Sequence, residues 1–319
     1  MEMSDHSITY RLENSEENKH YAWDNAEEPV LTVDSGDVVR FECPAANDGS
    51  FSVSTQVEDV PDISLDPGHA LIGPVAVEGA EPGDVLAVEL LEVQHRGWGW
   101  TAHMPEKGLL QEEFDDYGLH IWDLNGDTGS FVNGIEVPLD PFLGQVGVAP
   151  SEPGAHHTIP PRETGGNLDL KHLTERSTVY LPVEVENALF SIGDGHAAQG
   201  DGEVCVTGIE APMFVTARFT LREGMDLRRP QFETTGPFTP TGSDEPMYGT
   251  TGISDDLREA TKEAIRSMID HLHDTRDLTR SEAYLLCSVA VDLKVNQVVD
   301  EPNWTVAAYL PESIFPDPS

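Results

Sequence analysis

The segment FVTARFTLREG, residues 214–224, carries the clearest structural signal in this sequence. Apolar and polar side chains alternate along it, with one face made by Val215, Ala217, Phe219 and Leu221 and the other by Thr216, Arg218 and Thr220. Successive side chains of a strand point to opposite sides of a sheet, so a period of two predicts a strand with one buried face. The segment therefore places the chain among mainly β proteins.

Other segments extend this prediction in both directions. Four more stretches resemble strands, at residues 37–45, 84–93, 177–185 and 203–210. The turns DSGDVV (34–39) and AEPGDVL (80–86) both lead directly into a strand, and Pro82-Gly83 suits a tight turn whose second central residue has positive φ. We interpret the two turns as a weak internal repeat within a β-sandwich or jelly-roll-like fold. The alternative is that any two such turns look alike.

Two helices are predicted near the C-terminus, at 254–276 and 279–293. Ser254 is the expected N-cap of the first, and Thr279 with Glu282 forms a capping box for the second. The intervening residues 231–252 are rich in Gly, Pro and Thr and predict a long loop or lid. We expect a single domain over 1–319, with a β-rich core at about 20–225 and a helix-containing C-terminal part at about 253–312.

The charge balance limits the classes of partner. The chain has 58 acidic residues against 18 Lys and Arg, for a net charge of −40. Such a surface repels nucleic acid and anionic membranes, so neither is expected as a partner. The acids are spread along the whole chain, which favours adaptation to a salt-rich, halophilic cytoplasm over a disordered acidic tail. No signal peptide or membrane-spanning run is evident, so we expect a soluble cytoplasmic protein.

The three cysteines, Cys43, Cys205 and Cys287, are too few and too widely spaced for a disulfide framework or a CxxC metal site. Each is best interpreted as a small buried residue. The alternative is that one of them is a catalytic nucleophile, and Cys205 is the nearest to a candidate site.

The stretch LFSIGDGHAAQGDGEVCV, residues 189–206, combines glycines, acids and one histidine between two apolar runs. Only small residues flank His196, so its ring is free to act as a general base or a metal ligand. Asp194 and Glu203 lie close in sequence, and a histidine with several carboxylates suits a mixed nitrogen and oxygen site for a divalent ion. A solvated acidic hairpin is the alternative interpretation.

Three further segments concentrate polar residues and glycines. In GGNLD (165–169), Asn167 and Asp169 would share one face of an extended chain, and the alternative is a local Asx turn. His69 and Glu78 lie in the segment 65–84, and Asp48 follows the strand predicted at 37–45. The neighbours His156 and His157 would face opposite ways on a strand, so they are not expected to share one site.

Two runs carry a family resemblance: GPVAVEGAEPGDVLAVELLEV, and GGNLDLKHLTERSTVYLPVEVENALFSIGDGHAAQGDGEVCVTGIE. Together with SEAYLLCSVAVDLKVNQVVDEPNWTVAAYLP near the C-terminus, they closely resemble the acetamidase/formamidase family, over roughly residues 20–312. The resemblance implies an amidase that hydrolyses short amides such as formamide and acetamide to a carboxylate and ammonia. It also implies a β-sandwich, a homo-oligomer and a divalent metal, Zn²⁺ or Ca²⁺. A non-catalytic β-sandwich that binds a small ligand or Ca²⁺ is the alternative.

The matching motifs suggest how the site is divided. We expect the metal ligands among His196, Asp169, His69, Glu78 and Asp48. Glu203 or Asp194 would accept the proton of the attacking water, and Asn167 would stabilise the oxyanion. Because such small amides offer little binding surface, we expect a tight, deep pocket.

Overall fold

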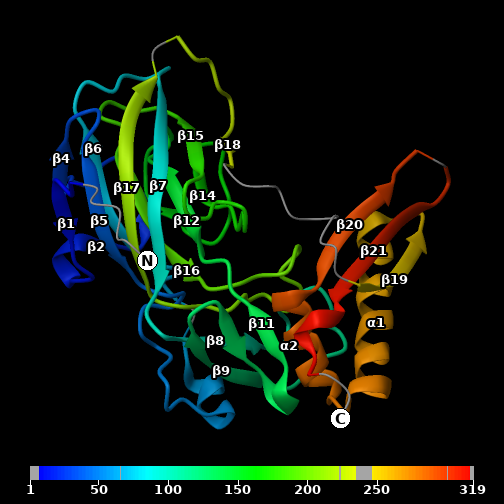
Figure 1. Cartoon of the computed structure of the whole chain (residues 1–319). Coiled ribbons are helices and arrows are strands. Elements are labelled where there is room, and N and C mark those ends of the chain that lie inside the picture. The colour runs from blue at the N-terminus through cyan, green and yellow to red at the C-terminus, as the bar shows by residue number, and fades with distance from the viewer. Residues whose placement is uncertain (1–6, 65, 223, 235–245, 300, 317–319) are drawn as a thin grey trace.

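The computed structural model describes residues 7–64, 66–222, 224–234, 246–299 and 301–316. Its largest part is a sandwich of two sheets (Figure 1). The first sheet has the order β1-β5-β17-β7-β15-β18, made by Tyr10–Leu12, Val38–Cys43, Met213–Arg222, Val85–His95, Thr178–Pro182 and Gln231–Glu233. The predicted segment 214–224 is β17, and it lies between β5 and β7, antiparallel to both.

The second sheet has the order β14-β12-β16-β6-β2, with β4 pairing in parallel with β6. Its strands are Gly165–Asn167, Phe142–Val148, Phe190–His196, Leu71–Val77 and Lys19–His20, and β4 is Leu31–Val33. Strands β6, β12 and β16 are buried along their whole length. The buried strands therefore hold any polar side chain that they carry away from bulk water.

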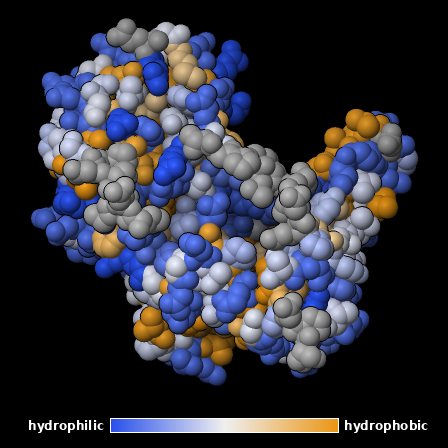
Figure 2. All heavy atoms as spheres, in the orientation of Figure 1, coloured by the Kyte–Doolittle hydropathy of each residue, from blue (hydrophilic) through white to orange (hydrophobic). Residues whose placement is uncertain are grey.

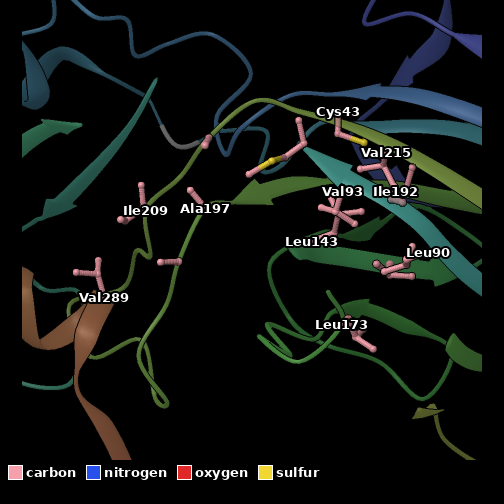
Figure 3. Close-up of a cluster of buried hydrophobic side chains, with 14 of the residues drawn as sticks. Cys43, Leu90, Val93, Leu143, Leu173, Ile192, Ala197, Ile209, Val215 and Val289 are labelled. Atoms are coloured by element: carbon pink, nitrogen blue, oxygen red, sulfur yellow. The ribbon is translucent and has the colours of Figure 1, made fainter. Parts of the chain in front are cut away.

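The core forms where the two sheets face one another. Val215, Ala217 and Phe219 of β17 are fully buried, as predicted, whereas Thr216 on the opposite face is also buried and Leu221 is only partly buried. Phe219 packs edge-on against Phe190 of the second sheet, with ring centroids 5.0 Å apart. Figure 3 shows part of the same apolar cluster, which continues from the sandwich to Val289 in the C-terminal part.

Smaller elements extend the sandwich at one end. A sheet of order β11-β10-β9-β8 lies below it in Figure 1, and β13 pairs with β3. These strands are Glu136–Pro138, Thr128–Ser130, Gly118–Asn125, Trp98–His103, His156–His157 and Ala22–Trp23. Short 3₁₀ turns occupy Glu16–Asn18, Val57–Asp62, Val132–Gly134 and Glu312–Ile314.

The C-terminal layer pairs two helices with a sheet of its own. The helices are α1 (Leu257–Arg276) and α2 (Arg280–Ala290). Strand β19 (Met247–Ser254) precedes them, and β20 (Asp292–Gln297) and β21 (Trp304–Pro311) follow them. The order of the strands in the sheet is β19-β21-β20. Helix α1 lies along β19 and β21, and this unit projects beside the sandwich as an arm (Figure 1). The mainly β sandwich with two C-terminal helices is confirmed, and the C-terminal sheet was not predicted.

The two turns singled out in the sequence are built alike. In each, a backbone amide bonds to the aspartate three residues on, from Asp34 to Asp37 and from Glu81 to Asp84, at 2.9 and 3.0 Å. Gly83 has φ +103°, the positive value predicted for it. The turns feed β5 and β7, which flank β17 on its two sides. The resemblance between the two sequence segments therefore corresponds to equivalent places in one sheet.

Three predictions about elements are wrong in detail. Residues 203–210 form an irregular loop, because Glu203 and Val206 adopt positive φ and interrupt an extended chain. The loop predicted at 231–252 has strands at both ends, β18 and β19, while residues 235–245 lie outside the described residues. Asp256 caps α1 in place of Ser254, accepting from the amide of Glu259. The capping box of α2 is confirmed. Across the described residues, no helix is long and apolar enough to cross a membrane.

Candidate functional site

The site is built around the end of β16, where the strand brings Asp194 and His196 into the buried interior. Their side chains are only 2% exposed. Asp194 has φ +57°, a left-handed conformation that aspartate tolerates better than most residues. The flanking glycine at 195 is required by close packing, since a Cβ there would collide with the carbonyl of Ala211. The GDGH motif is therefore a strand whose backbone geometry presents an acid and a histidine to one cavity.

The loop that follows β16 folds back onto His196. The Nε2 atom of His196 lies 3.3 Å from Oε1 of Glu203 and 3.1 Å from Oε1 of Glu210. The amide of Gly208 donates to the same oxygen of Glu210 at 2.9 Å. Glu203 and Glu210 thus approach one edge of the imidazole from the two ends of a single loop.

Helix α2 holds this loop in place. Ser288 accepts from the amide of Cys205 at 3.1 Å and donates to the carbonyl of Thr207 at 2.7 Å. Its own carbonyl accepts from the amide of Gly200 at 2.8 Å, and the hydroxyl of Tyr284 donates to the carbonyl of Val204. A helix late in the sequence therefore fixes the position of the two glutamates.

The GGNLD motif supplies the opposite wall. Gly165 and Gly166 have φ +108° and +93°, the backbone freedom that the sequence predicted for them. The amide of Asn167 donates to Oδ2 of Asp169 at 2.8 Å. Asn167 is itself oriented by Gln145 of β12, whose Nε2 donates to Oδ1 of Asn167 at 2.7 Å. Three side chains thus form a relay that ends on the carboxylate of Asp169.

His69 is the second histidine beside the buried acids. Its Nδ1 atom lies 3.1 Å from Oδ1 of Asp194, and its backbone amide donates to the hydroxyl of Thr158 at 2.8 Å. Although burial opposes the shift, the charges of His69 and His196 lower the pKa of Asp194 to about 2. Burial also opposes the rise of the His69 pKa, but Asp194 raises it to about 9. The ion pair between these two side chains is therefore the favoured state at neutral pH.

The other acids are crowded together with little water. Burial and the neighbouring Glu203 hold the pKa of Asp169 well above its usual range. Burial likewise raises the pKa of Glu210 to about 7. Glu210 and Asp194 raise the pKa of His196 against the effect of burial. A cluster of this kind favours a bound positive charge, which would relieve the repulsion between the carboxylates.

The residues fit a divalent metal ion. Two groups, Asp169–His196–Glu203 and Asp194–His196–Glu210, each bring one ligand atom per residue within 4.8 Å of one another. Within the described part of the chain, Oε2 of Glu210 is buried without a hydrogen-bond partner, and Oδ1 of Asp194 has only Nδ1 of His69 beside it, at 3.1 Å. Buried carboxylate oxygens seldom lack a hydrogen-bond partner, and a bound cation would provide an interaction in its place. The donors, imidazole nitrogen and carboxylate oxygen, are those that zinc accepts.

Gly144 of β12 makes room for this cluster. A Cβ built on it would lie 2.5 Å from Oδ2 of Asp194 and 2.6 Å from Oδ1 of Asp169. It would also lie 2.8 Å from Cε1 of His196. These distances are shorter than van der Waals contact, so no side chain larger than hydrogen fits here without displacing the acids.

The cluster lies in a cavity of about 330 Å³. Besides the polar residues, its wall includes the apolar side chains Ala46, Trp100, Met104, Ile159 and Val206. A larger, more open cavity of about 670 Å³ lies between the sandwich and the C-terminal layer, but its lining lacks the histidine–carboxylate cluster. The smaller cavity is therefore the candidate site. It is roomier than the tight pocket predicted for formamide or acetamide.

The structure assembles most of the predicted site but leaves two residues outside it. Asn167, Asp169, Asp194, His196, Glu203 and His69 all line the cavity. Asp48 does not: its carboxylate accepts from Lys19 and from Tyr21, at 2.8 and 2.9 Å, and ties the N-terminal segment to the sandwich. Glu78 is exposed in the turn after β6. Asp48 and Glu78 were predicted from motif position alone, and local partners or exposure decide where they lie.

Asp201, which lies in the same stretch as His196 and Glu203, does not line the cavity, and its carboxylate lies 3.4 Å from Nζ of Lys171. The expectations about the paired histidines and the cysteines are confirmed. His157 lines the cavity, whereas the ring of His156 bonds to the carbonyl of Glu152, so the two histidines do not share a site. Cys43, Cys205 and Cys287 are free and buried, and none of these three described thiols lines the cavity. Burial raises the pKa of the Cys205 thiol to about 11, which disfavours a thiolate nucleophile.

Three residues of the site were not predicted. Glu210 is the last residue of a segment interpreted as a strand, and an acid inside a mostly apolar run was the available signal. Gly144 and Gln145 lie within PFLGQVGV (141–148), where a polar amide in an apolar strand was the corresponding signal. Neither signal tells which site residues these side chains will contact, because residues distant in sequence are brought together only when β12 pairs with β14 and β16.

Known proteins resemble this chain over nearly its whole length. A model of the Acetamidase/Formamidase family matches residues 6–154 and 152–317. An acetamidase of Mycolicibacterium smegmatis is 31% identical, across 72% of this chain and 71% of that protein. A formamidase of Methylophilus methylotrophus is 27% identical, across 93% and 89% of the two chains. The solved structure of a gamma lactamase from Delftia acidovorans is similar with a TM-score of 0.89 at 27% identity, covering 97% of this chain and 95% of that one.

Proposed function

This chain belongs to the acetamidase/formamidase family, and we propose that it is an amidase that hydrolyses the C–N bond of an amide to a carboxylate and ammonia. The family assignment confirms the resemblance drawn from GGNLD and GDGHAAQGDGE. One observation supports placing the reaction in the cavity described above: His196 lies within 3.3 Å of both Glu203 and Glu210 beside two further buried acids. The names of the relatives favour short amides as the substrate class.

We propose that the cluster holds a divalent metal ion. His196 would provide the nitrogen ligand in one of two groups, Asp194–His196–Glu210 or Asp169–His196–Glu203, and the first group leaves the carboxylate of Glu203 free. A set that mixes imidazole and carboxylate suits Zn²⁺ better than Ca²⁺, which prefers oxygen ligands throughout. When bound, such an ion polarises the amide carbonyl and lowers the pKa of water.

Glu203 is the carboxylate best placed to move protons. Its side chain is 19% exposed, compared with 3% for Glu210 and 2% for Asp194, so water entering the cavity reaches it first. It would accept a proton from the attacking water and deliver it to the departing nitrogen, which leaves as ammonia. Asp194 instead pairs with His69 and holds that ring in place.

Asn167 is placed to bind the substrate or the oxyanion. One of the two N–H groups of its amide donates to Asp169, which leaves the other for a ligand in the cavity. Gln145 fixes the orientation, because its N–H group requires the oxygen of Asn167 to face it. The amide nitrogen of Asn167 is therefore directed to the side of the cluster.

The test is ammonia release by protein purified at high salt, together with its metal content. We expect turnover of short amides, loss of activity on dialysis against a chelator, and recovery with Zn²⁺. His196→Ala should lose both metal and activity, whereas Glu186→Gln, which changes an exposed acid in a turn, should lose neither. Full activity in His196→Ala, or after complete metal removal, would contradict the metal proposal.

We further propose a homo-oligomer in a salt-rich cytoplasm. The three buried thiols are free, as is usual in a reducing compartment. Exposed apolar side chains gather on the C-terminal arm, including Ile253, Val295 and Val299, and the orange patch at the end of the arm in Figure 2 marks part of this surface. Such a patch is typical of a surface covered by another subunit. Light scattering at high salt measures the number of subunits.

A further inference from the structure

The size of the cavity does not match the smallest amides. Its volume is about 330 Å³, room for roughly ten water molecules at about 30 Å³ each. Formamide and acetamide are only a few non-hydrogen atoms in size and would leave most of that space to water. A pocket selects a small ligand by enclosing it closely, and this cavity has room for an acyl group larger than acetyl.

One wall of the cavity is apolar and rigid. Trp100 of β8 is 1% exposed and stacks face to face on Phe51, with ring centroids 3.7 Å apart. Met104, just beyond the same strand, and Ala46 lie on the same wall and are buried. This wall has fixed side chains that offer contact to an apolar group and few hydrogen bonds.

Two aliphatic side chains also stand at the entrance. Ile159 and Val206 line the cavity while remaining 43% and 39% exposed. They come from different loops, one after β13 and one after Glu203. On a surface as acidic as this one, aliphatic residues at a cavity entrance indicate a surface that a ligand covers.

Val206 is held there in a strained conformation. Its φ is +84°, a value that a β-branched residue rarely adopts. Its amide bonds to the carbonyl of Glu203 at 2.9 Å, and the adjacent Cys205 and Thr207 are bound to helix α2. Strain of this kind persists where the surroundings impose it, and it is concentrated at functional sites. The loop thus keeps one aliphatic side chain at the entrance and Glu203 at the cluster.

We propose that the substrate is an amide whose acyl group is apolar and larger than acetyl, branched or ring-bearing. The amide would lie at the acid cluster, and the acyl group would lie against Trp100 and Met104 with Val206 and Ile159 closing over it. This inference rests on the proposed amidase function and specifies its substrate class. Lys107 and Asp66 at the rim are exposed, and the buried acids disfavour an anionic substrate, so a carboxylate-bearing amide is the class rejected.

The experiment compares kcat/KM for ammonia release from formamide, acetamide, isobutyramide, benzamide and succinamate in high salt. An added methylene in an apolar pocket changes kcat/KM by about 10- to 200-fold, so we expect at least a roughly tenfold rise from acetamide to isobutyramide. Formamide, acetamide or succinamate as the best substrate would overturn the inference while leaving the amidase function standing. Turnover of none of the amides would overturn the amidase function itself.

A variant at the entrance, with a matched control elsewhere on the surface, provides a second measurement. Val206→Asn keeps a similar size and tolerates positive φ, so it should fold at least as stably as the parent. We expect it to lower the ratio of kcat/KM for isobutyramide to that for acetamide by about tenfold. Val30→Asn, which changes an exposed valine just before β4, should leave this ratio unchanged. An unchanged ratio in Val206→Asn would remove Val206 from the acyl-binding surface.

Discussion

At the scale of single residues, the absence of a side chain at position 144 shapes the site as much as the acids around it. Gly144 lies on a fully buried strand, and its Cα faces Asp169, Asp194 and His196. It is not among the residues with positive φ, so an alanine would fit its backbone conformation. Any effect of substitution therefore comes from the space that the new methyl group occupies.

We predict that Gly144→Ala lowers both metal content and activity by at least about tenfold. The new Cβ would overlap carboxylate oxygens, and inserting a methyl group into a packed interior costs about 1–3 kcal/mol. Metal analysis of the purified variant and ammonia release measure the effect. Wild-type metal content with normal kcat would show that the cluster relaxes around the methyl group and that the space is not needed.

Gln145 is a positioning residue: it bonds to Asn167, which in turn bonds to Asp169 of the cluster. Gln145→Glu keeps the shape of the side chain but replaces the donor facing Asn167 by an acceptor. We predict a fall in kcat of about tenfold, corresponding to about 1.4 kcal/mol, with a smaller change in KM. Gln145→Glu at low pH, where the new carboxyl is protonated and can donate, should recover part of the loss. A pH profile identical to that of the parent would argue against the relay.

His20 couples stability to pH. Its Nδ1 atom donates to the carbonyl of Ala22 at 2.7 Å, so Nε2 is the acceptor for Ser191, at 2.8 Å. Burial lowers the pKa of His20, and the unfolded chain therefore binds a proton more readily than the folded one. Stability from this residue is complete above the unfolded pKa of about 6.5 and is lost as the pH falls below it. Melting temperatures measured across that range should fall less steeply in His20→Gln, and parallel curves would contradict this role.

At the scale of elements, the loop between β16 and β17 shows where prediction from the sequence stops. The strands at 37–45, 84–93, 177–185 and 214–224 could be predicted because their apolar residues follow the period of a strand. Residues 203–210 have a similar composition, but Glu203 and Val206 adopt left-handed conformations that are imposed by contacts with α2. Composition contains no information about that distant helix. For the same reason Glu210 was missed, whereas His196 and Asp169 were found in motifs whose local backbone already presents them.

The contact between α1 and β19 depends on another close approach. A Cβ on Gly252 would collide with the carbonyl of Ala260, and the hydroxyl of Thr250 donates to the carbonyl of Ala264 at 2.8 Å. We predict that Gly252→Ala destabilises the protein by about 1–3 kcal/mol by forcing the helix off the strand. Gly249→Ala on the same strand is the control, since the nearest atoms to its Cβ lie 3.9 Å away. Thermal unfolding measures both, and equal melting temperatures would contradict the proposed contact.

At the scale of the whole molecule, the net charge of −40 sets the conditions under which the fold holds. Salt shortens the distance over which charges repel, from about 10 Å at 0.1 M to about 3 Å at 1 M. We predict that the melting temperature and activity both rise with KCl over this range and that activity is lost at low salt. A melting temperature that is flat between about 0.1 M and 1 M would contradict adaptation to a salt-rich cytoplasm.

The sandwich could be predicted as a class because its turns and strands are local features, and the acid cluster could be predicted in part because two motifs carry it. The C-terminal sheet could not, because Met247–Ser254 is rich in glycine and threonine and acquires its partners only from residues after 290. Asp48 and Glu78 were assigned to the site from motif position, and the structure shows that a motif's neighbours need not share its cavity. Long-range pairing is the information that the sequence pattern lacks.

The contacts of Ser288 and Tyr284 with the loop after β16 have a consequence for synthesis. A ribosome delivers the GDGH strand, both glutamates and every strand of the sandwich before helix α2 is made. Until Ser288 reaches Gly200, Cys205 and Thr207, the loop that carries Glu203 and Glu210 is held by its bonds to β8 and to the segment after it but lacks its bonds to α2. A nascent chain can thus close its sandwich while the loop around its cluster of acids is not yet fully held. The enzyme would become able to capture a metal ion only when translation is nearly complete.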